Sequence, residues 1–330
     1  MNVQPPPPCQ LGARIAVTGA TGLIGRAVCD HLEQVSGFTV AALVRDSRPR
    51  GSEIKPVRPD GHGVCEDKGA DRPFDLAQGR RPIFRGDLAT GDFRPFLSGC
   101  TGLVHCAFSH VPGKYRGGEG GDPLKFWELN LIGTLRLLEH ARLSGVRRVV
   151  LLSSRAVYAK DDFRPGQQID ETHHPRPDTH YGAQKMALEA LASAYTTPDF
   201  GVSALRLTGV YGGPKEMNKW RQLFINVSMG LLPARNRTAT EVHIQTVVEA
   251  ISILLTHAFA AGKIFNLSEV RVSCAQILQA AGFKGLSLPV AEAMHGPELT
   301  CAAIKSLGLV LRDEGDLAAA ALDLRAQLKI

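Results

Sequence analysis

The sequence predicts an α/β fold, a doubly wound parallel sheet followed by a smaller C-terminal lobe. Runs of strand length alternate with helical patterns of ten or more residues from residue 14 to about residue 267. The 330 residues are 44% hydrophobic and 21% charged, which supplies a full core and excludes a disordered or fibrous chain.

The first unit of this alternation is a strand, a turn, a helix and a second strand. Residues 14–18 are a short apolar run, helical periodicity follows from Ile24 to Leu32, and residues 38–44 form the next strand. Such a βαβ unit has a right-handed crossover and two parallel strands.

The later elements continue the same order. Residues 47–82, rich in Arg, Asp, Gly and Pro and without strand or helix periodicity, are predicted as a surface insertion. We expect strands at 83–84, 102–107, 149–152 and 202–207, and helices at 123–144, 181–194, 241–256, 275–281 and 317–328.

Domain boundaries follow from where the pattern changes. Residues 1–12 contain four consecutive prolines and no apolar stretch of a signal peptide, so they are predicted as a flexible tail. The main domain is predicted to cover 13–208 and 241–267, and the smaller lobe 209–240 and 268–330.

Charge and cysteine content exclude several classes of protein. The net charge of +6 is spread thinly, without the dense basic stripe of a nucleic-acid-binding protein. No run approaches the ~18 apolar residues of a membrane span. Seven cysteines without paired spacing favour a reducing, cytoplasmic location. His105, Cys106 and His110 lack a fourth ligand, so no metal site is expected.

A glycine-rich turn joins the first strand to the first helix. Gly19, Gly22 and Gly25 let the backbone turn tightly and bring the positive end of the helix toward a pyrophosphate. In this βαβ context the turn predicts a dinucleotide-binding Rossmann domain. The predicted cofactor-binding residues here are Gly19, Thr21, Gly22, Leu23, Ile24 and Gly25.

The end of the second strand selects between NADP and NAD. Arg45 stands where an acidic residue would bind the adenosine ribose of NAD, and a guanidinium suits the 2′-phosphate of NADP. NADP is therefore the predicted cofactor. The neighbouring Asp46 keeps NAD as the alternative.

Three residues carry the predicted catalytic chemistry. Tyr181 and Lys185 are four apart on one helix face, and Ser154 ends a predicted parallel strand. A nearby ammonium lowers the pKa of a phenol, so Tyr181 can exchange a proton with an alcohol oxygen. Lys185 also holds the nicotinamide ribose, and Ser154 orients the substrate oxygen.

These segments together resemble the extended short-chain dehydrogenases/reductases of the NAD-dependent epimerase/dehydratase family. The resemblance implies that Asp87 and Leu88 contact the adenine and that Ala107 lines the cofactor groove. It also implies a homodimer formed through the helices at 123–144 and 181–194. The matching segments are 18–25, 86–88, 130–134, 153–158, 181–185 and 205–212.

Several residues differ from the family pattern, and these differences reduce the range of reactions and substrates that the resemblance implies. Arg155 and Ala156 replace the acid and base of sugar-nucleotide 4,6-dehydratases, which argues against dehydration. Nucleotide-sugar epimerases carry a diphosphate-binding asparagine at position 209 and an arginine at position 239. Here position 209 is glycine and position 239 is alanine, and Arg235 or Arg237 would have to take the place of the arginine. Thr246 stands where the family has an aspartate. These differences weaken the interpretation as a nucleotide-sugar enzyme.

The predicted function is that of an NAD(P)-dependent oxidoreductase or epimerase, which transfers hydride between nicotinamide and a secondary alcohol or ketone. Two alternatives stay open. The first is a nucleotide-sugar 4-epimerase with tightly bound NAD, and the second is a catalytically silent cofactor-binding regulator. The intact set Ser154, Tyr181 and Lys185 argues against the second.

Overall fold

The computed structural model describes residues 5–45, 55–57, 81–111, 114, 117–159, 161–164, 166–293 and 296–330. The chain divides into two compact units. Unit 1 comprises Met1–Leu151, Ala187–Ser203 and Leu254–Lys263, and unit 2 comprises Leu152–Met186, Ala204–Ile253 and Ile264–Ile330.

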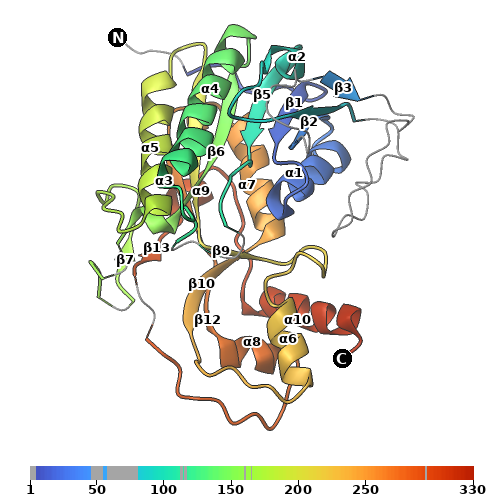
Figure 1. Cartoon of the computed structure of the whole chain (residues 1–330), viewed down its shortest axis with the longest axis vertical. Coiled ribbons are helices and arrows are strands. Elements are labelled where there is room, and N and C mark those ends of the chain that lie inside the picture. Colours follow the sequence, from blue (N-terminus) through green and yellow to red (C-terminus); the bar gives the residue numbers. More distant parts are fainter. Residues whose placement is uncertain are drawn as a thin grey trace. The chain divides into compact units, whose positions relative to one another are not determined.

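The main sheet has eight strands among the described residues, in the order β11-β8-β6-β5-β1-β2-β4-β3. Strand β1 lies inside the sheet, and the chain winds away from it in both directions, which confirms the predicted doubly wound α/β class (Figure 1). Strand β3 runs antiparallel to β4 at one edge. The strands are β1 (Arg14–Thr18), β2 (Thr39–Arg45), β3 (Lys55–Val57), β4 (Ile83–Gly86), β5 (Cys100–His105), β6 (Arg148–Ser154), β8 (Gly201–Leu207) and β11 (Ile264–Leu267).

The strands of unit 1 are buried on both faces, as parallel strands are when helices cover the sheet. Strand β2 has five consecutive buried residues between its exposed ends. Helix α1 (Leu23–Gln34) buries Gly25, Val28, Cys29 and Leu32, the spacing of one helix face. The short helix α2 (Arg94–Leu97) buries Phe96 and Leu97.

The predicted helix at 123–144 is three helical segments in one run. Helix α3 (Pro123–Trp127) passes into a π-helical turn, Glu128–Ile132, and then into α4 (Gly133–Leu143). Pro123 and the Asp122 side chain, which accepts from the Lys125 N–H at 3.0 Å, begin the helix. The wider π turn holds the buried Asn130.

Residues 5–12, for which the sequence predicts a flexible tail, make specific contacts in unit 1. The buried Arg148 donates from Nε to the Pro7 carbonyl at 3.1 Å and from Nη2 to the Pro6 and Ala258 carbonyls. The Cys9 N–H donates to the Leu255 carbonyl at 2.9 Å. Carbonyl acceptors for a buried guanidinium explain why this proline segment packs against the domain.

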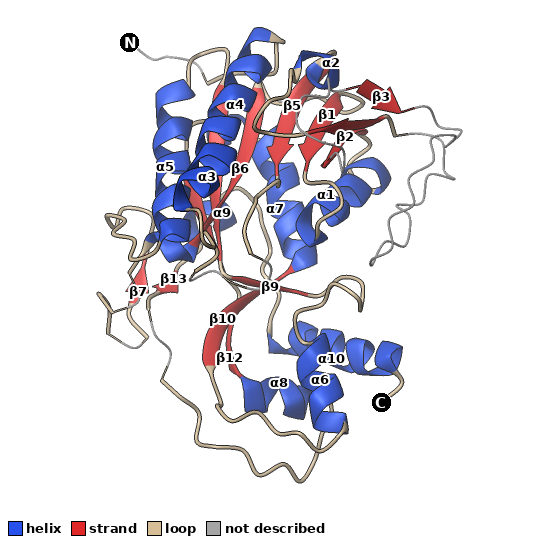
Figure 2. Ribbon diagram, in the orientation of Figure 1, coloured by secondary structure: helices blue, strands red, loops and turns tan. Residues whose placement is uncertain are grey.

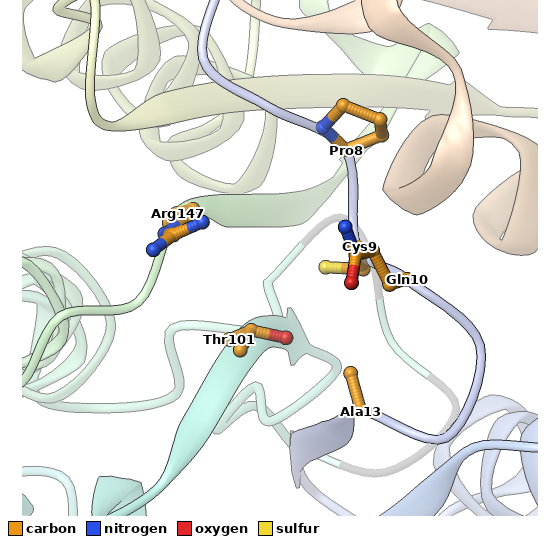
Figure 3. A pocket seen from close by; sticks show the side chains of 6 residues that line it. All are labelled: Pro8, Cys9, Gln10, Ala13, Thr101 and Arg147. Carbon is orange, nitrogen blue, oxygen red and sulfur yellow. The ribbon is translucent and has the colours of Figure 1, made fainter.

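A pocket of about 120 Å³ lies beside this segment (Figure 3). Its lining comes from residues 8–10 and from the amino ends of β1, β5 and β6, at the edge of the sheet opposite to the glycine turn. Burial raises the pKa of the Cys9 thiol. The residues that line the pocket are Pro8, Cys9, Gln10, Ala13, Thr101 and Arg147.

Unit 2 contains a three-stranded sheet in the order β12-β10-β9 (Figure 2). Strand β9 (Gly209–Tyr211) runs parallel to β10 (Thr238–His243), and β12 (Val270–Ser273) runs antiparallel to it. Helices α6 (Arg221–Ser228), α8 (Cys274–Ala280) and α10 (Glu314–Leu328) form one apolar cluster with this sheet. Side-chain capping boxes at Ser273 and Asp313 begin α8 and α10.

The remaining described elements are two long helices, α5 and α7, and several short segments. They are β7 (Gln168–Ile169), β13 (Glu298–Leu299), α5 (His180–Tyr195), α7 (Ile244–Thr256), α9 (Ala302–Lys305) and two 3₁₀ turns, Arg155–Val157 and Ala258–Ala260. In the part of the chain that the structure describes, no helix has the length and apolar character needed to cross a membrane.

The start of helix α7 and the 47–82 segment are the places where the structure and the sequence predictions have to be compared. The predicted helix at 241–256 was wrong at its start, because Glu241 and His243 pair with β9 and the helix begins at Ile244. The predicted insertion at 47–82 lies mostly outside the described residues, and its described part includes β3. The domain limits at 208, 241 and 268 stay predictions.

Candidate functional site

The predicted cofactor residues of unit 1 gather at one edge of its sheet. Gly19 follows β1, Arg45 ends β2, Asp87 follows β4, and Ala107 lies two residues after β5. Because β2 pairs in parallel with β1 and β4, and β1 with β5, these four positions share the carboxyl edge. Open α/β sheets bind ligands at this edge.

The glycine turn is too tight for side chains at two positions. Gly19 has φ +66°, and a Cβ there would lie 2.7 Å from the Ala107 nitrogen. A Cβ at Gly25 would lie 2.2 Å from the Gly19 carbonyl oxygen. Because glycine has no Cβ, helix α1 can begin directly against the end of β1. No side chain caps α1, whose N-cap is Gly22. An uncapped helix start beside a tight turn fits a pyrophosphate, which the backbone amides would bind.

The Asp87–Leu88 turn is held by the helix that follows the π turn. A Cβ at Gly133 would lie 3.0 Å from both the Leu88 Cβ and its carbonyl oxygen, so a side chain here would have to push Leu88 back by a few tenths of an ångström. Asp87 Oδ1 accepts from the Ala89 N–H at 2.8 Å, and Arg136 donates to the Ala89 carbonyl. The family segment 130–134 therefore positions the predicted adenine-binding turn.

A buried polar network joins the ends of β1 and β5 to helix α4. His105 bonds through Nδ1 to Thr18 Oγ1 at 2.7 Å and through Nε2 to Thr134 Oγ1 at 2.9 Å. Thr18 Oγ1 also accepts from the Ala107 N–H at 3.2 Å. His105 is thus a structural hydrogen-bonding residue that fixes the strand ends beneath the predicted cofactor edge. In the sequence, the only indication of this structural role of His105 was its place at the end of a predicted strand.

Asn130 fixes the loop that follows β5. Its Oδ1 accepts from the Ser109 N–H at 2.7 Å, and its Nδ2 donates to the Ser109 carbonyl at 2.8 Å. Thr134 Oγ1 donates to the Asn130 carbonyl at 2.5 Å, which connects this loop to the His105 network. Sequence reasoning gave Asn130 no role beyond its place in a family motif.

The three predicted catalytic residues all lie in unit 2. Ser154 is the last residue of β6, and its Oγ accepts from the Ala156 N–H at 3.2 Å. Tyr181 and Lys185 lie in the first turns of α5, with Lys185 Nζ 5.6 Å from the centre of the Tyr181 ring. At this distance the ammonium makes a cation–π contact with the tyrosine ring.

Two contacts hold helix α5 against the end of β6. The buried Lys185 donates from Nζ to the Leu152 carbonyl at 2.8 Å. A Cβ at Gly182 would lie 2.0 Å from the Ala156 carbonyl oxygen, so the glycine between Tyr181 and Lys185 lets backbone meet backbone. The structure therefore brings the segments of Ser154, Tyr181 and Lys185 together.

The threonine that replaces the family aspartate has a carboxylate partner from elsewhere. Thr246 donates from Oγ1 to Glu269 Oε1, and the His243 N–H donates to Glu269 Oε2 at 2.6 Å. The Arg312 N–H donates to Oε1 at 2.9 Å. Glu269 thus supplies a carboxylate at the start of helix α7. It lies 23 residues from Thr246, and no sequence motif connects the two.

The structure also shows the surroundings of Gly209, where the family pattern has a diphosphate-binding asparagine, and of the two possible substitutes for the missing arginine. Arg235 is bound to Glu292, at 2.6 Å from Nε to Oε1, whereas Arg237 is exposed at the residue before β10. A Cβ at Gly209 would lie 2.4 Å from Lys219 Nζ and 2.7 Å from Glu241 Oε2. The Lys219–Glu241 ion pair therefore fills the space that a larger residue at 209 would need.

Metal binding has no support in the described part of the chain, where no three His, Cys, Asp or Glu side chains gather as a metal ion requires. Cys106 and His110 lie in the loop after β5. Asp46, the alternative ribose-binding residue, lies outside the described residues.

The family model described as the NAD dependent epimerase/dehydratase family matches residues 15–268. The chain belongs to this family. The match confirms the resemblance inferred from the motifs, and with it the predicted class of NAD-dependent, oxidoreductase-type enzymes at the level of the family. It covers all the predicted site residues, from Gly19 to Lys185.

Curated relatives include epimerases and a reductase. A UDP-glucose 4-epimerase from Streptomyces lividans is 31% identical over 54% of this chain and 46% of its own length. One from Vibrio cholerae is 28% identical over 77% of this chain and 70% of its own. A putative dihydroflavonol 4-reductase from Synechocystis is 31% identical over 56% of this chain and 46% of its own length. The chain spans about half the length of the first and third.

Solved structures share the fold across nearly the whole chain. MoeE5 in complex with UDP-glucose and NAD has a TM-score of 0.72 and 24% identity, and covers 96% of this chain and 100% of that one. The Thermus thermophilus UDP-glucose 4-epimerase complex with NAD has a TM-score of 0.68 and 22% identity, with 94% and 99% covered. These similarities confirm the Rossmann-type fold.

We expect Gly25→Ala to abolish cofactor binding. Its Cβ would overlap the Gly19 carbonyl and push α1 away from the end of β1, so NADPH and NADH affinity should fall more than tenfold. Cofactor fluorescence titration measures this. Gly121→Ala is the control, since no atom lies within 4 Å of the Cβ it adds. Unchanged affinity in Gly25→Ala would remove the glycine turn from the cofactor site.

Proposed function

We propose that this chain transfers hydride between a nicotinamide cofactor and a secondary alcohol or ketone, with Tyr181 as the acid/base. The observation that carries the proposal is the placement of Ser154, Tyr181 and Lys185 by two contacts, Gly182 on Ala156 and Lys185 on Leu152. Family membership and the epimerases and reductase among the relatives support it.

Each residue has a distinct part in the proposed reaction. Ser154 donates a hydrogen bond to the substrate oxygen and orients it. Tyr181 accepts the hydroxyl proton during oxidation and returns it during reduction, while Lys185 stabilises the phenolate. Lys185 also binds the nicotinamide ribose. When bound, the cofactor supplies the hydride acceptor or donor.

Tyr181→Phe tests the acid/base role. The phenyl ring keeps the packing and removes the hydroxyl, so turnover should fall roughly 10²–10⁴-fold while cofactor affinity stays within about twofold. Steady-state rates and fluorescence titration measure the two effects. Tyr195→Phe, at the other end of α5, is the matched control. Turnover near that of the wild type in Tyr181→Phe would exclude this tyrosine.

A nucleotide-sugar 4-epimerase is the second candidate. The relatives named as UDP-glucose 4-epimerases favour it, and the neighbours solved with NAD agree with a tightly held cofactor. Gly209 and Ala239 argue against it. The purified protein distinguishes the two: retained NAD with UDP-galactose formed from UDP-glucose supports the epimerase, whereas exchangeable NADPH consumed with a ketone supports the reductase.

We propose NADP(H) as the preferred cofactor, on the grounds that Arg45 is exposed at the carboxyl end of β2, beside Gly86 of β4. From that position a guanidinium would pair with a 2′-phosphate. The NAD-bound neighbours favour the alternative, in which Arg45 is solvated.

Arg45→Ala tests this preference. A charge-assisted contact is worth about 1.5–3 kcal/mol, so the wild type should bind NADPH roughly ten- to a hundredfold more tightly than NADH, less so in high salt. The variant should lose that difference and keep its NADH affinity. Arg94→Ala, which removes an exposed ion pair with Asp92, is the control. If the wild type bound NADH with the same affinity as NADPH, or more tightly, the cofactor would be assigned as NAD.

We also propose a homodimer in a reducing, cytoplasmic location. Leu124, Ile132 and Leu143 are exposed along the helical run 123–143, whereas Leu137 and Leu138 of the same run are core residues. The low cysteine content without paired spacing is the ground for the reducing compartment. Light scattering at micromolar concentration should give twice the chain mass of 35.5 kDa, and a monomer mass would exclude the dimer.

A further inference from the structure

The proline segment near the start of the chain takes no part in the proposed reaction, yet it docks on unit 1 in a regular way. Pro6 and Cys9 are buried, and residues 5, 7, 8 and 10 are exposed. Consecutive prolines favour the polyproline II conformation, which repeats every three residues. Buried residues three apart therefore agree with a polyproline II segment that lays one face on the domain.

The surface under this segment is a row of three residues on neighbouring strands. Gly201 begins β8, Arg148 begins β6, and Gly102 of β5 is the register partner of Arg148. The three strands are neighbours in the order β8-β6-β5. We call these three residues the Gly-Arg-Gly row.

The two glycines of the row leave room for the two buried side chains of the segment. A Cβ at Gly201 would lie 2.7 Å from Pro6 Cγ and 2.6 Å from Ala261 Cβ. A Cβ at Gly102 would lie 3.0 Å from Cys9 Sγ. The row thus accepts Pro6 at β8 and Cys9 at β5.

The spacing of these two contacts matches the repeat of the segment. Neighbouring strands are about 4.8 Å apart, so the distance across the sheet from β8 to β5 is about 9.6 Å. Three residues of polyproline II rise about 9.3 Å. A polyproline II segment that crosses the strands therefore places every third residue over a glycine of the row, which explains why Pro6 and Cys9 are the buried positions.

Arg148 binds the main chain between the two glycines. The residue is 1% exposed, and it donates from Nε to the Pro7 carbonyl at 3.1 Å and from Nη2 to the Pro6 carbonyl. Proline has no N–H, and polyproline II has no internal hydrogen bonds, so its carbonyls are free to accept. A buried donor at this place favours a segment whose main chain offers carbonyls alone.

We propose that the Gly-Arg-Gly row is a binding site for polyproline II peptides, and that residues 5–9 of this chain are its ligand. The ligand class is a proline-rich segment with compact apolar side chains three residues apart and free carbonyls between them. No strand pairing holds residues 5–9, so the segment can leave the row while the rest of unit 1 stays folded. The inference is independent of the proposed reaction.

The labelling rate of Cys9 in the full chain measures this local opening. The reagent is a fluorescein maleimide, which is larger than the pocket of about 120 Å³ beside Cys9, and peptide mass spectrometry locates the label. Cys29 and Cys100, which are buried elsewhere in unit 1, report opening of the whole unit. Cys9 should be labelled roughly tenfold faster than either, or more.

Arg148→Met should release the segment, because its carbonyls lose their donor. Labelling of Cys9 should accelerate roughly tenfold, and that of Cys29 and Cys100 should not change. Arg147→Met is the matched control, since it removes an exposed arginine one residue away. The positive charges of both arginines oppose the rise in the pKa of the Cys9 thiol, so loss of charge alone would slow the labelling.

Pro6→Lys and Pro5→Lys test the three-residue spacing with the same substitution at a buried and an exposed position. Only Pro6→Lys brings a second cation against the buried Arg148, so it should accelerate Cys9 labelling roughly tenfold, whereas Pro5→Lys should stay within about twofold. Pro6→Lys leaves the row itself unchanged. It therefore also provides a full-length protein with an open site.

A synthetic peptide of residues 5–10 with a fluorescein label tests binding from solution. It should bind the Pro6→Lys protein with a Kd between about 10 µM and 1 mM by fluorescence anisotropy. The wild type should bind it roughly tenfold more weakly, because its own segment competes at a high effective concentration. The same peptide carrying Pro6→Lys should not bind either protein.

Four results would overturn the proposal: labelling of Cys9 no faster than that of Cys29 and Cys100, no acceleration in Arg148→Met, equal rates in Pro6→Lys and Pro5→Lys, or no peptide binding by Pro6→Lys. Rapid labelling of Cys29 and Cys100 would reveal a variant that does not fold. If Arg148→Met behaves in that way, Pro6→Lys and the peptide decide the question.

Discussion

The start of helix α5 lies so close to the turn after β6 that no side chain fits between them. Gly182 permits this contact with the Ala156 carbonyl, and Lys185 adds a hydrogen bond to Leu152 on the same strand. The two contacts bring the first turns of α5, which carry Tyr181 and Lys185, to the end of the strand that carries Ser154. The proposed chemistry depends on this approach, since a phenol is a weak base without a nearby cation.

A similar approach of backbone to backbone shapes the proposed cofactor edge of unit 1. Gly19 and Gly25 bring α1 against the end of β1, and Gly133 brings α4 against Leu88. His105 and Asn130 then fix the ends of the neighbouring strands through buried hydrogen bonds. For the proposed cofactor, hydrogen-bonded strand ends and an uncapped helix start would preorganise the backbone amides, and preorganisation reduces the entropy lost on binding.

Unit 2 contains the positions at which the sequence differs from the pattern that the family resemblance implies. Glu269 supplies a carboxylate to Thr246, where that pattern has an aspartate, and so holds the start of α7, which is a structural role. By contrast, Glu241 is a buried carboxylate whose cation partner is Lys219, and burial raises the pKa of Glu241 against the influence of that ammonium.

The sequence by itself determined the alternation of strands and helices around β1 in the main sheet, the glycine turn and the Ser154, Tyr181 and Lys185 set, because each follows from local periodicity or from residues close together in the chain. It misassigned Glu241 to a helix, since pairing with β9 and β12 overrides a local helical pattern. Only the tertiary structure decided the surroundings of Glu241 and the roles of Glu269 and His105. Their partners lie on other elements, and contacts between distant segments leave no spacing pattern in a sequence.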